Sequence, residues 1–138
     1  PVGSDKLKTV VQELAAAQSG QGADLLVRAA GRTGGGVVAA ARARRARAVG
    51  VDSDQYLTAP ADQQPRILTS MLKRVDTATF DMIQSIVDGD PVVSYVTYDL
   101  AADGVGYSTS GGFVDDITDQ LDGFADEIKA GLEVPAAP

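Results

Sequence analysis

Residues that could hold a ligand or do chemistry lie at three points of the chain, each at the end of a short apolar run. These are the glycine-rich segment 30–36, the acidic segment 50–55 and the segment 70–74, which contains a lysine and an arginine. In open sheets of alternating strands and helices, ligands bind beyond the carboxyl ends of the strands. The three segments are therefore candidates for one shared binding site.

The first candidate is the turn Ala30-Gly31-Arg32-Thr33-Gly34-Gly35-Gly36, between a predicted strand and a predicted helix. Glycines let a ligand approach the backbone, and a helix N-terminus presents free N–H donors. We therefore expect Gly31, Thr33 and Gly34 to bind the ligand. The turn is no P-loop, because the Gly-Lys-Ser/Thr ending is absent, and it does not match the dinucleotide pattern GxGxxG. A purely structural turn is the other interpretation.

The second candidate is Asp52, which directly follows the predicted strand 47–51. A carboxylate beyond a buried strand can accept two hydrogen bonds from a diol. The alternative is an aspartate that only caps the backbone of the loop.

The third candidate is Lys73, between the predicted strand 66–71 and the predicted helix 75–87. A cation at a helix N-terminus is electrostatically unfavourable. Its position indicates either a ligand or a partner carboxylate such as Asp52. The alternative is a solvent-facing lysine, since lysines are common on protein surfaces.

Composition excludes several classes of function. The chain has neither cysteine nor histidine, so it lacks thiolate ligands and the commonest general base and metal ligand. No serine has an evident base beside it, and we predict neither an enzyme, a metal site nor a cofactor. The net charge is −7, with 16 Asp against 3 Glu, and such a surface repels nucleic acid.

Three other charged or polar segments have simpler interpretations. The arginines at 42, 44, 45 and 47 fit the polar face and end of a helix, where cations suit the dipole. The aspartates at 115, 116, 119 and 122 lie near a helix start and do not form the calcium-loop pattern. Segment 107–110 (Tyr-Ser-Thr-Ser) is either a binding loop or a crossing on the hinge side.

Periodicity and turn residues predict alternating helices and strands. The expected helices are 6–17, 37–45, 75–87 and 113–130, and the expected strands are 23–30, 47–51, 66–71 and 92–98. This order predicts an α/β fold with a doubly wound parallel sheet covered on both faces. Residues 1–138 form a single lobe in this interpretation, with a frayed tail at 132–138. No apolar run approaches the ~18 residues that a membrane span needs.

The segments together resemble a known family. The strings Ala29-Ala30-Gly31, Gly50-Val51-Asp52-Ser53-Asp54-Gln55, Leu68 to Asp76 and Gly104-Val105-Gly106-Tyr107 occur in order. They resemble the C-terminal lobe of the basic membrane lipoprotein family, whose purine-nucleoside receptors feed ABC importers. The resemblance implies one lobe of a class I periplasmic-binding-protein-like fold with its opening strand largely missing. Residues 1–4 are at most a stub of that strand, so we expect a fragment, or a lobe completed by another segment, chain or copy.

The resemblance also implies a function. A nucleoside would lie in the cleft between two lobes, with Asp52 and Lys73 holding the ribose hydroxyls and the Gly31 turn closing over it. The implied partners are the nucleoside, the missing N-terminal lobe or a partner chain, and an ABC permease, with no nucleic acid. The implied location is extracytoplasmic, at the cell membrane through an upstream lipid anchor.

Three alternatives belong to other classes. The lobe could be the sensor of a transcriptional regulator of the same family, with any DNA-binding segment outside these residues. A nucleotide-dependent enzyme would need a GxGxxG turn or a catalytic base, and neither is present. The third alternative is a non-binding assembly module, which the bulky Arg32 in the first turn favours.

Overall fold

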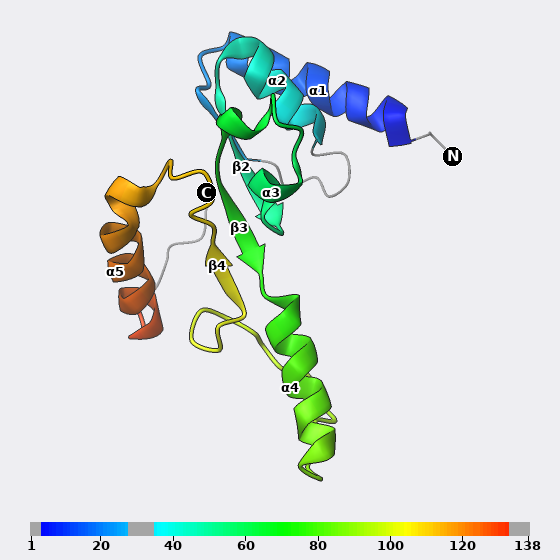
Figure 1. Ribbon diagram of the computed structural model, residues 1–138, viewed down its shortest axis with the longest axis vertical. Helices are drawn as coiled ribbons and strands as arrows, with labels where there is room; N and C mark the ends of the chain where they lie inside the picture. The colour runs from blue at the N-terminus through cyan, green and yellow to red at the C-terminus, as the bar shows by residue number, and fades with distance from the viewer. Residues whose placement is uncertain (1–3, 28–34, 133–138) are drawn as a thin grey trace. The chain divides into compact units, whose positions relative to one another are not determined.

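The computed structural model describes residues 4–27 and 35–132, and Figure 1 shows their elements. The helices are α1 (Ser4–Gly20), α2 (Gly35–Arg44), α3 (Gln55–Thr58), α4 (Val75–Val87) and α5 (Thr118–Lys129), with short 3₁₀ turns at Gln64–Arg66 and Asp115–Ile117. The strands are β1 (Leu25–Val27), β2 (Arg47–Asp52), β3 (Ile67–Lys73) and β4 (Val105–Tyr107).

The strands form one sheet in the order β1-β2-β3-β4. β1 pairs with β2 and β2 with β3, both in parallel. Backbone hydrogen bonds join Ser108 N to Ser70 O and Arg74 N to Gly104 O. The residue number therefore falls along one strand as it rises along the other, so β4 lies antiparallel to β3. The α/β class and the parallel order of the first three strands are thus confirmed, and an antiparallel strand at the sheet edge is added.

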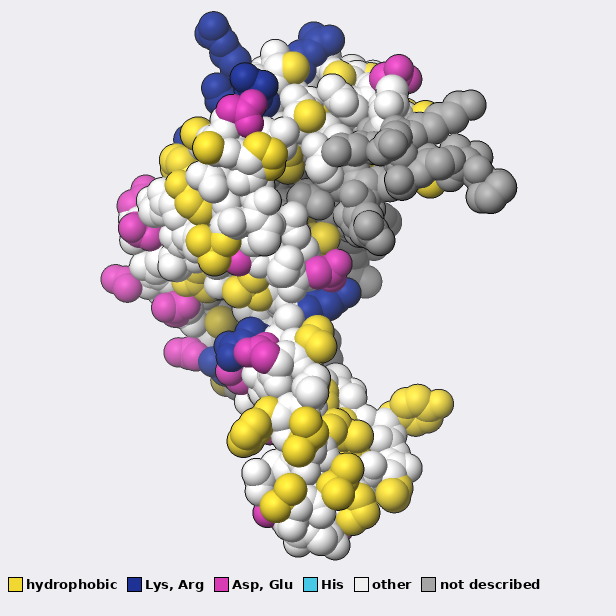
Figure 2. Space-filling model, turned by 45° about the vertical axis from the view of Figure 1, so that its right-hand side comes forward, with side chains coloured by type: hydrophobic (Ala, Val, Ile, Leu, Met, Phe, Trp, Pro, Cys, Tyr) yellow, Lys and Arg dark blue, Asp and Glu magenta, His cyan; other side chains and the backbone are white. Residues whose placement is uncertain are grey.

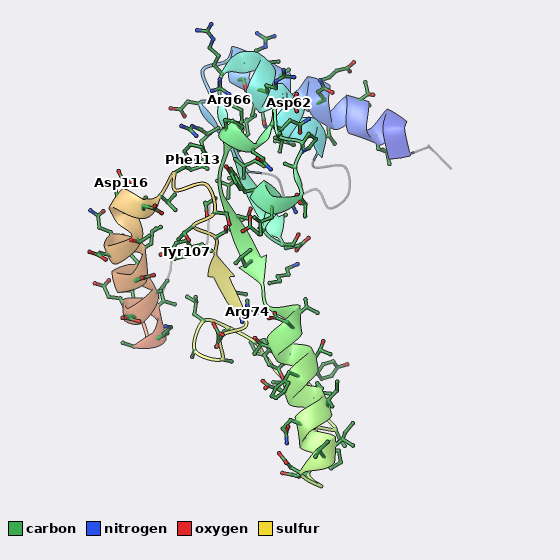
Figure 3. All side chains as sticks on the ribbon, viewed as in Figure 1. Asp62, Arg66, Arg74, Tyr107, Phe113 and Asp116 are labelled. Atoms are coloured by element: carbon green, nitrogen blue, oxygen red, sulfur yellow. The ribbon has the colours of Figure 1, made fainter. Side chains whose placement is uncertain are left out.

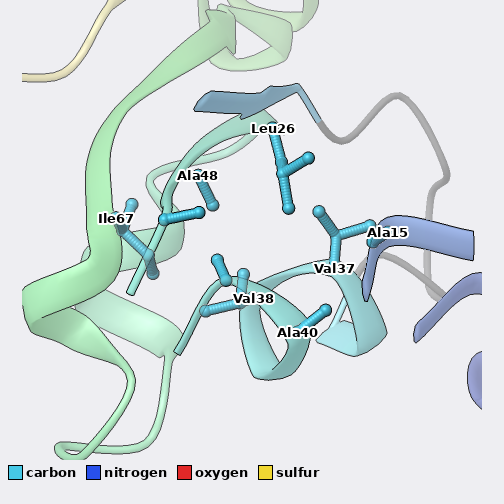
Figure 4. Packing of buried hydrophobic residues seen from close by; sticks show 9 residues of the cluster. Ala15, Leu26, Val37, Val38, Ala40, Ala48 and Ile67 are labelled. Atoms are coloured by element: carbon cyan, nitrogen blue, oxygen red, sulfur yellow. The ribbon is translucent and has the colours of Figure 1, made fainter. Parts of the chain in front are cut away.

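The hydrophobic core lies between α2 and the strands, in the compact unit formed by residues 1–72 and 107–114. Figure 4 shows Val37 and Val38 of α2 directed at Leu26, Ala48 and Ile67 of the strands. Alanines 15, 40 and 41 are also buried, and their small size lets α1 approach α2 closely. The core is aliphatic, as the shortage of aromatic residues requires.

The second unit comprises residues 73–106 and 115–138 and contains α4 and α5. Helix α4 has the predicted bounds, but none of its residues is buried. Its large apolar side chains are exposed, including Phe80 (65%), Ile83 (59%) and Ile86 (67%). Figure 2 shows hydrophobic side chains gathered on the surface in the region that contains α4. The helical period was therefore correct, whereas the burial expected from it is not seen within this unit.

The predicted strand at 92–98 is wrong. Those residues form no strand, and their apolar side chains are exposed, with Val93 at 92% and Tyr95 at 106%. The fourth strand instead occurs at Val105–Tyr107, where no strand was predicted. β-branched and aromatic residues favour strands through cross-strand packing, and a run without such a partner gains nothing from extension in a sheet.

A tight turn explains why β4 begins only after residue 104. The side chain of Asp99 accepts hydrogen bonds from the N–H groups of Ala101 and Ala102, and Gly104 N donates to Asp99 O. A Cβ at Gly104 would lie 2.3 Å from Cβ of Tyr98, so only glycine fits there. The chain is thereby reversed just before it reaches the edge of the sheet.

Candidate ligand-binding site

The candidate site begins at the carboxyl ends of β2 and β3. The two strands are in register from Gly50 opposite Ser70 to Asp52 opposite Leu72. Asp52 is the last residue of β2, and Lys73, which follows Leu72, is the last residue of β3. Both side chains are exposed. The sequence therefore placed these two residues correctly at strand ends.

The backbone at Asp52 has an unusual conformation. Its φ is +73°, and Ser53 N donates a 3.0 Å hydrogen bond to Val51 O across it. This is the pattern of a γ-turn with a positive φ at its centre, which is rare and strained. Outside glycine, such a backbone costs about 1–3 kcal/mol and persists only where its surroundings hold it.

Asp54, two residues further on, is the most highly bonded side chain near this turn. Its Oδ2 accepts hydrogen bonds from Oγ of Ser108 (2.6 Å) and Oγ of Ser110 (2.5 Å), and its Oδ1 accepts one from Tyr56 N (3.1 Å). Partial burial by itself raises the pKa of the Asp54 carboxyl, but the hydrogen bonds from the two serines and the backbone outweigh it and lower that pKa. Asp54 is thus held ionised while it caps α3.

The base of the turn is fixed to β3 by a close approach of backbone and side chains. Gln55 N donates to Oγ of the fully buried Ser70, and Gln55 Nε2 donates to Val51 O and to Oγ of Ser53. A Cβ at Gly50 would lie 2.5 Å from Oγ of Ser70 and from Cγ of Gln55. Glycine is therefore required at position 50 for the start of α3 to lie against β3.

In the second unit, the residue after Lys73 anchors the start of α4. Arg74 occupies the N-cap position and bonds to Asp76 (3.3 Å) and Asp103 (3.1 Å), and its backbone N donates to Gly104 O. Figure 3 labels Arg74 at the junction of β3 and α4. Hydrogen bonding from Arg74 lowers the pKa of the Asp76 carboxyl. The positive charge of Arg74 at the start of α4 is therefore balanced by two aspartates of the same unit.

The structure places only part of the predicted site. The positions of Gly31, Thr33 and Gly34 lie outside the described residues, so their expected role stays a prediction. Neither Asp54 nor the two serines, Ser108 and Ser110, was predicted from the sequence to be a site residue. The signal was present, because Asp54 lies in the acidic segment and the serines lie in the segment regarded as a binding loop or a crossing.

A serine hydroxyl beside a carboxylate, as at Ser108 and Asp54, could be a nucleophile with its general base, but Asp54 does not suit that role. The lowered pKa of Asp54 makes it a weak base at neutral pH, and a general base works best with a pKa near the working pH. Within residues 4–27 and 35–132, no three acidic side chains gather in a way that could hold a metal ion. In that same part of the chain, no helix is both long and apolar enough to cross a membrane.

Solved structures with similar folds are solute-binding proteins and a regulator. An ABC transporter system solute-binding protein from Conexibacter woesei has a TM-score of 0.74 at 22% identity, over 93% of this chain and 42% of that protein. A transcriptional activator of the comK gene from Bacillus halodurans has a TM-score of 0.77 at 19% identity, over 94% and 44%. A solute-binding protein from Aeropyrum pernix has a TM-score of 0.60 at 29% identity, over 90% and 33%. The fold is that of one lobe of a periplasmic-binding-protein-like solute receptor.

The sequence comparison identifies the family. Residues 4–136 match the Bmp family, described as ABC transporter substrate-binding protein PnrA-like, and the chain belongs to this family. CD4+ T-cell-stimulating antigens from Listeria monocytogenes and Listeria innocua are each 32% identical over 92% of the chain. The chain spans 40% of the length of these relatives. The resemblance inferred from the sequence is thus confirmed.

Proposed function

We propose that the chain is the C-terminal lobe of a solute receptor for an ABC importer and that it binds a nucleoside, most favourably a purine nucleoside. The observation that supports this most directly is the strained turn at Asp52, at the carboxyl end of β2. In α/β folds, ligands bind beyond the carboxyl ends of the strands, and this chain belongs to a family of substrate-binding proteins. An exposed carboxylate there can accept both hydrogen bonds of a ribose diol. Lys73, at the end of the neighbouring strand, is the second residue assigned to the ribose.

The mechanism in this proposal is binding without chemistry. A second lobe closes on the first, buries the ligand and creates the shape that a permease recognises. In this proposal Gly31, Thr33 and Gly34 also bind the ligand, and the turn at Gly31 closes over it through its backbone. The receptor is extracytoplasmic and is held at the membrane by a lipid anchor upstream of these residues.

The test is a nucleoside titration of the ¹⁵N-labelled chain, monitored by NMR. A single lobe offers only part of the contacts, so weak binding is expected, and shift changes detect millimolar affinity. Adenosine, guanosine and inosine should shift the amides of residues 50–55 and 70–74. Asp52→Ala should abolish these shifts, whereas Asp62→Ala, at an exposed surface ion pair with Arg42, should leave them unchanged. Shifts absent from both segments, or retained in Asp52→Ala, would refute the assignment.

A second candidate function is the ligand-sensing lobe of a transcriptional regulator. It is suggested by the fold likeness to the Bacillus halodurans activator. Both candidates use the same binding edge, so ligand titration does not separate them. Fractionation of cells does: a receptor for an importer is recovered with the cell envelope, and a regulator with the cytosol.

A further inference from the structure

The turn at Asp52 needs support from its surroundings, because a positive φ outside glycine costs free energy. Support comes from both sides of the turn. On one side, Gln55 Nε2 donates to Val51 O, the same carbonyl that accepts the hydrogen bond of the γ-turn from Ser53 N. On the other side, the chain leaves the turn directly into Asp54, which is bonded to the segment 108–110.

The contacts of Asp54 fix its carboxylate in one position. One oxygen accepts from two hydroxyls in segment 108–110, and the other accepts from the backbone at the start of α3. Segment 108–110 is itself tied to β3, because Ser108 N donates to Ser70 O and Oγ1 of Thr69 donates to Ser108 O at 2.6 Å. The exit of the turn is therefore connected to the neighbouring strand through Asp54.

The two serines have no proton left for a ligand. A hydroxyl has a single proton to donate, and Ser108 and Ser110 each donate theirs to Asp54. Ser108 Oγ also accepts a hydrogen bond from Ser110 N. Ser108 is only 5% exposed. In this structure the hydroxyls of Ser108 and Ser110 therefore serve Asp54 rather than a ligand.

We infer that Asp54 is a positioning residue, which holds the γ-turn at Asp52 through its hydrogen bonds to Ser108 and Ser110 and thereby aims the Asp52 carboxylate at the ligand. The effect on binding rests on the proposed function. The effect on the backbone of residue 52 does not, so the two can fail separately.

The test separates capping of α3 from positioning of Asp52. Asp54→Ser keeps an N-cap oxygen for Tyr56 N, because serine is as good a cap as aspartate, but it is too short to reach the two hydroxyls. Ser110→Ala removes one of the hydroxyls and leaves the cap intact, which provides a milder variant if Asp54→Ser does not fold. Asp62→Ser is the matched control on the surface of the same unit.

Two readouts are needed on the ¹⁵N-labelled chain. The coupling between the amide and α protons of residue 52 reports its φ, and hydrogen exchange of Ser53 N–H reports the γ-turn bond. Titration with guanosine reports binding. In Asp54→Ser we expect a changed coupling, faster exchange and affinity about tenfold weaker, because strain of this size is no longer held in the free protein. Ser110→Ala should change both readouts in the same direction, and Asp62→Ser should change neither.

Each contrary result has a definite meaning. An unchanged coupling and unchanged Ser53 exchange in both Asp54→Ser and Ser110→Ala would overturn the inference. Undiminished guanosine affinity in a variant whose turn has relaxed would also overturn it. If the unmodified chain shows no shifts with guanosine, the proposed function fails, and the backbone readouts still decide whether Asp54 holds the turn.

Discussion

Replacing Asp52 by glycine should stabilise the protein while it removes ligand binding. A side chain at a positive φ costs about 1–2 kcal/mol because Cβ crowds the following carbonyl. Glycine escapes this crowding but loses about 0.5–1 kcal/mol more conformational entropy on folding. The difference predicts that Asp52→Gly raises the free energy of unfolding, by up to about 1.5 kcal/mol.

The assay is urea unfolding monitored by circular dichroism, with Asp62→Gly as control. Asp62 is exposed and is not among the described non-glycine residues with positive φ, so glycine there should destabilise by about 0.5–1 kcal/mol. The opposite signs of the two changes distinguish strain at position 52 from a general effect of glycine. If Asp52→Gly destabilises the protein as much as Asp62→Gly does, Asp52 is not strained, and the positioning inference loses its premise.

Three further outcomes test the contacts that support the turn and the hydrophobic core of the same unit, each by urea unfolding. Gly50→Ala should cost about 1–3 kcal/mol, because the added methyl group would overlap Ser70 and Gln55; a cost near zero would refute the close approach. Ile67→Ala should cost about 2–5 kcal/mol, because Ile67 is 1% exposed in the core; a surface-like cost would place it outside the core. The lowered pKa of Asp54 contributes stability above its unfolded value of about 3.9, and that stability is lost as the pH falls through the lower folded pKa. Unfolding curves at a series of pH values should therefore show Asp54→Ser less stable than the parent at neutral pH, with a gap that narrows below about pH 4, and a constant gap would refute this.

Local sequence rules predicted the elements of the first unit well. Strands 47–51 and 66–71 and helix 37–45 were each placed within two residues, because each is a short apolar run bounded by turn or polar residues. Asp52 and Lys73 followed from the strand ends, since parallel strands present their carboxyl ends at one edge. These predictions needed only the order of the elements along the chain.

The supporting contacts could not be predicted in that way. Asp54 meets Ser108 across 54 residues of sequence, and no periodicity or turn rule links the two. The positive φ of Asp52 was equally hidden, because aspartate is common in ordinary loops as well as in left-handed positions. The contact between Asp54 and Ser108 depends on the antiparallel β4, which the sequence pattern did not predict.

The apolar residues of α4 and of segment 92–98 show the limit of periodicity most clearly. An amphipathic stripe predicts that a helix has an apolar face to bury, but it does not say what covers that face. Here the face is exposed in a chain that spans 40% of the length of its Listeria relatives. Exposed apolar patches of this kind mark surfaces that contact another part or partner. The unit that contains Asp52 and Asp54, by contrast, has its own buried core, so the strained turn and its support can be tested in this chain alone.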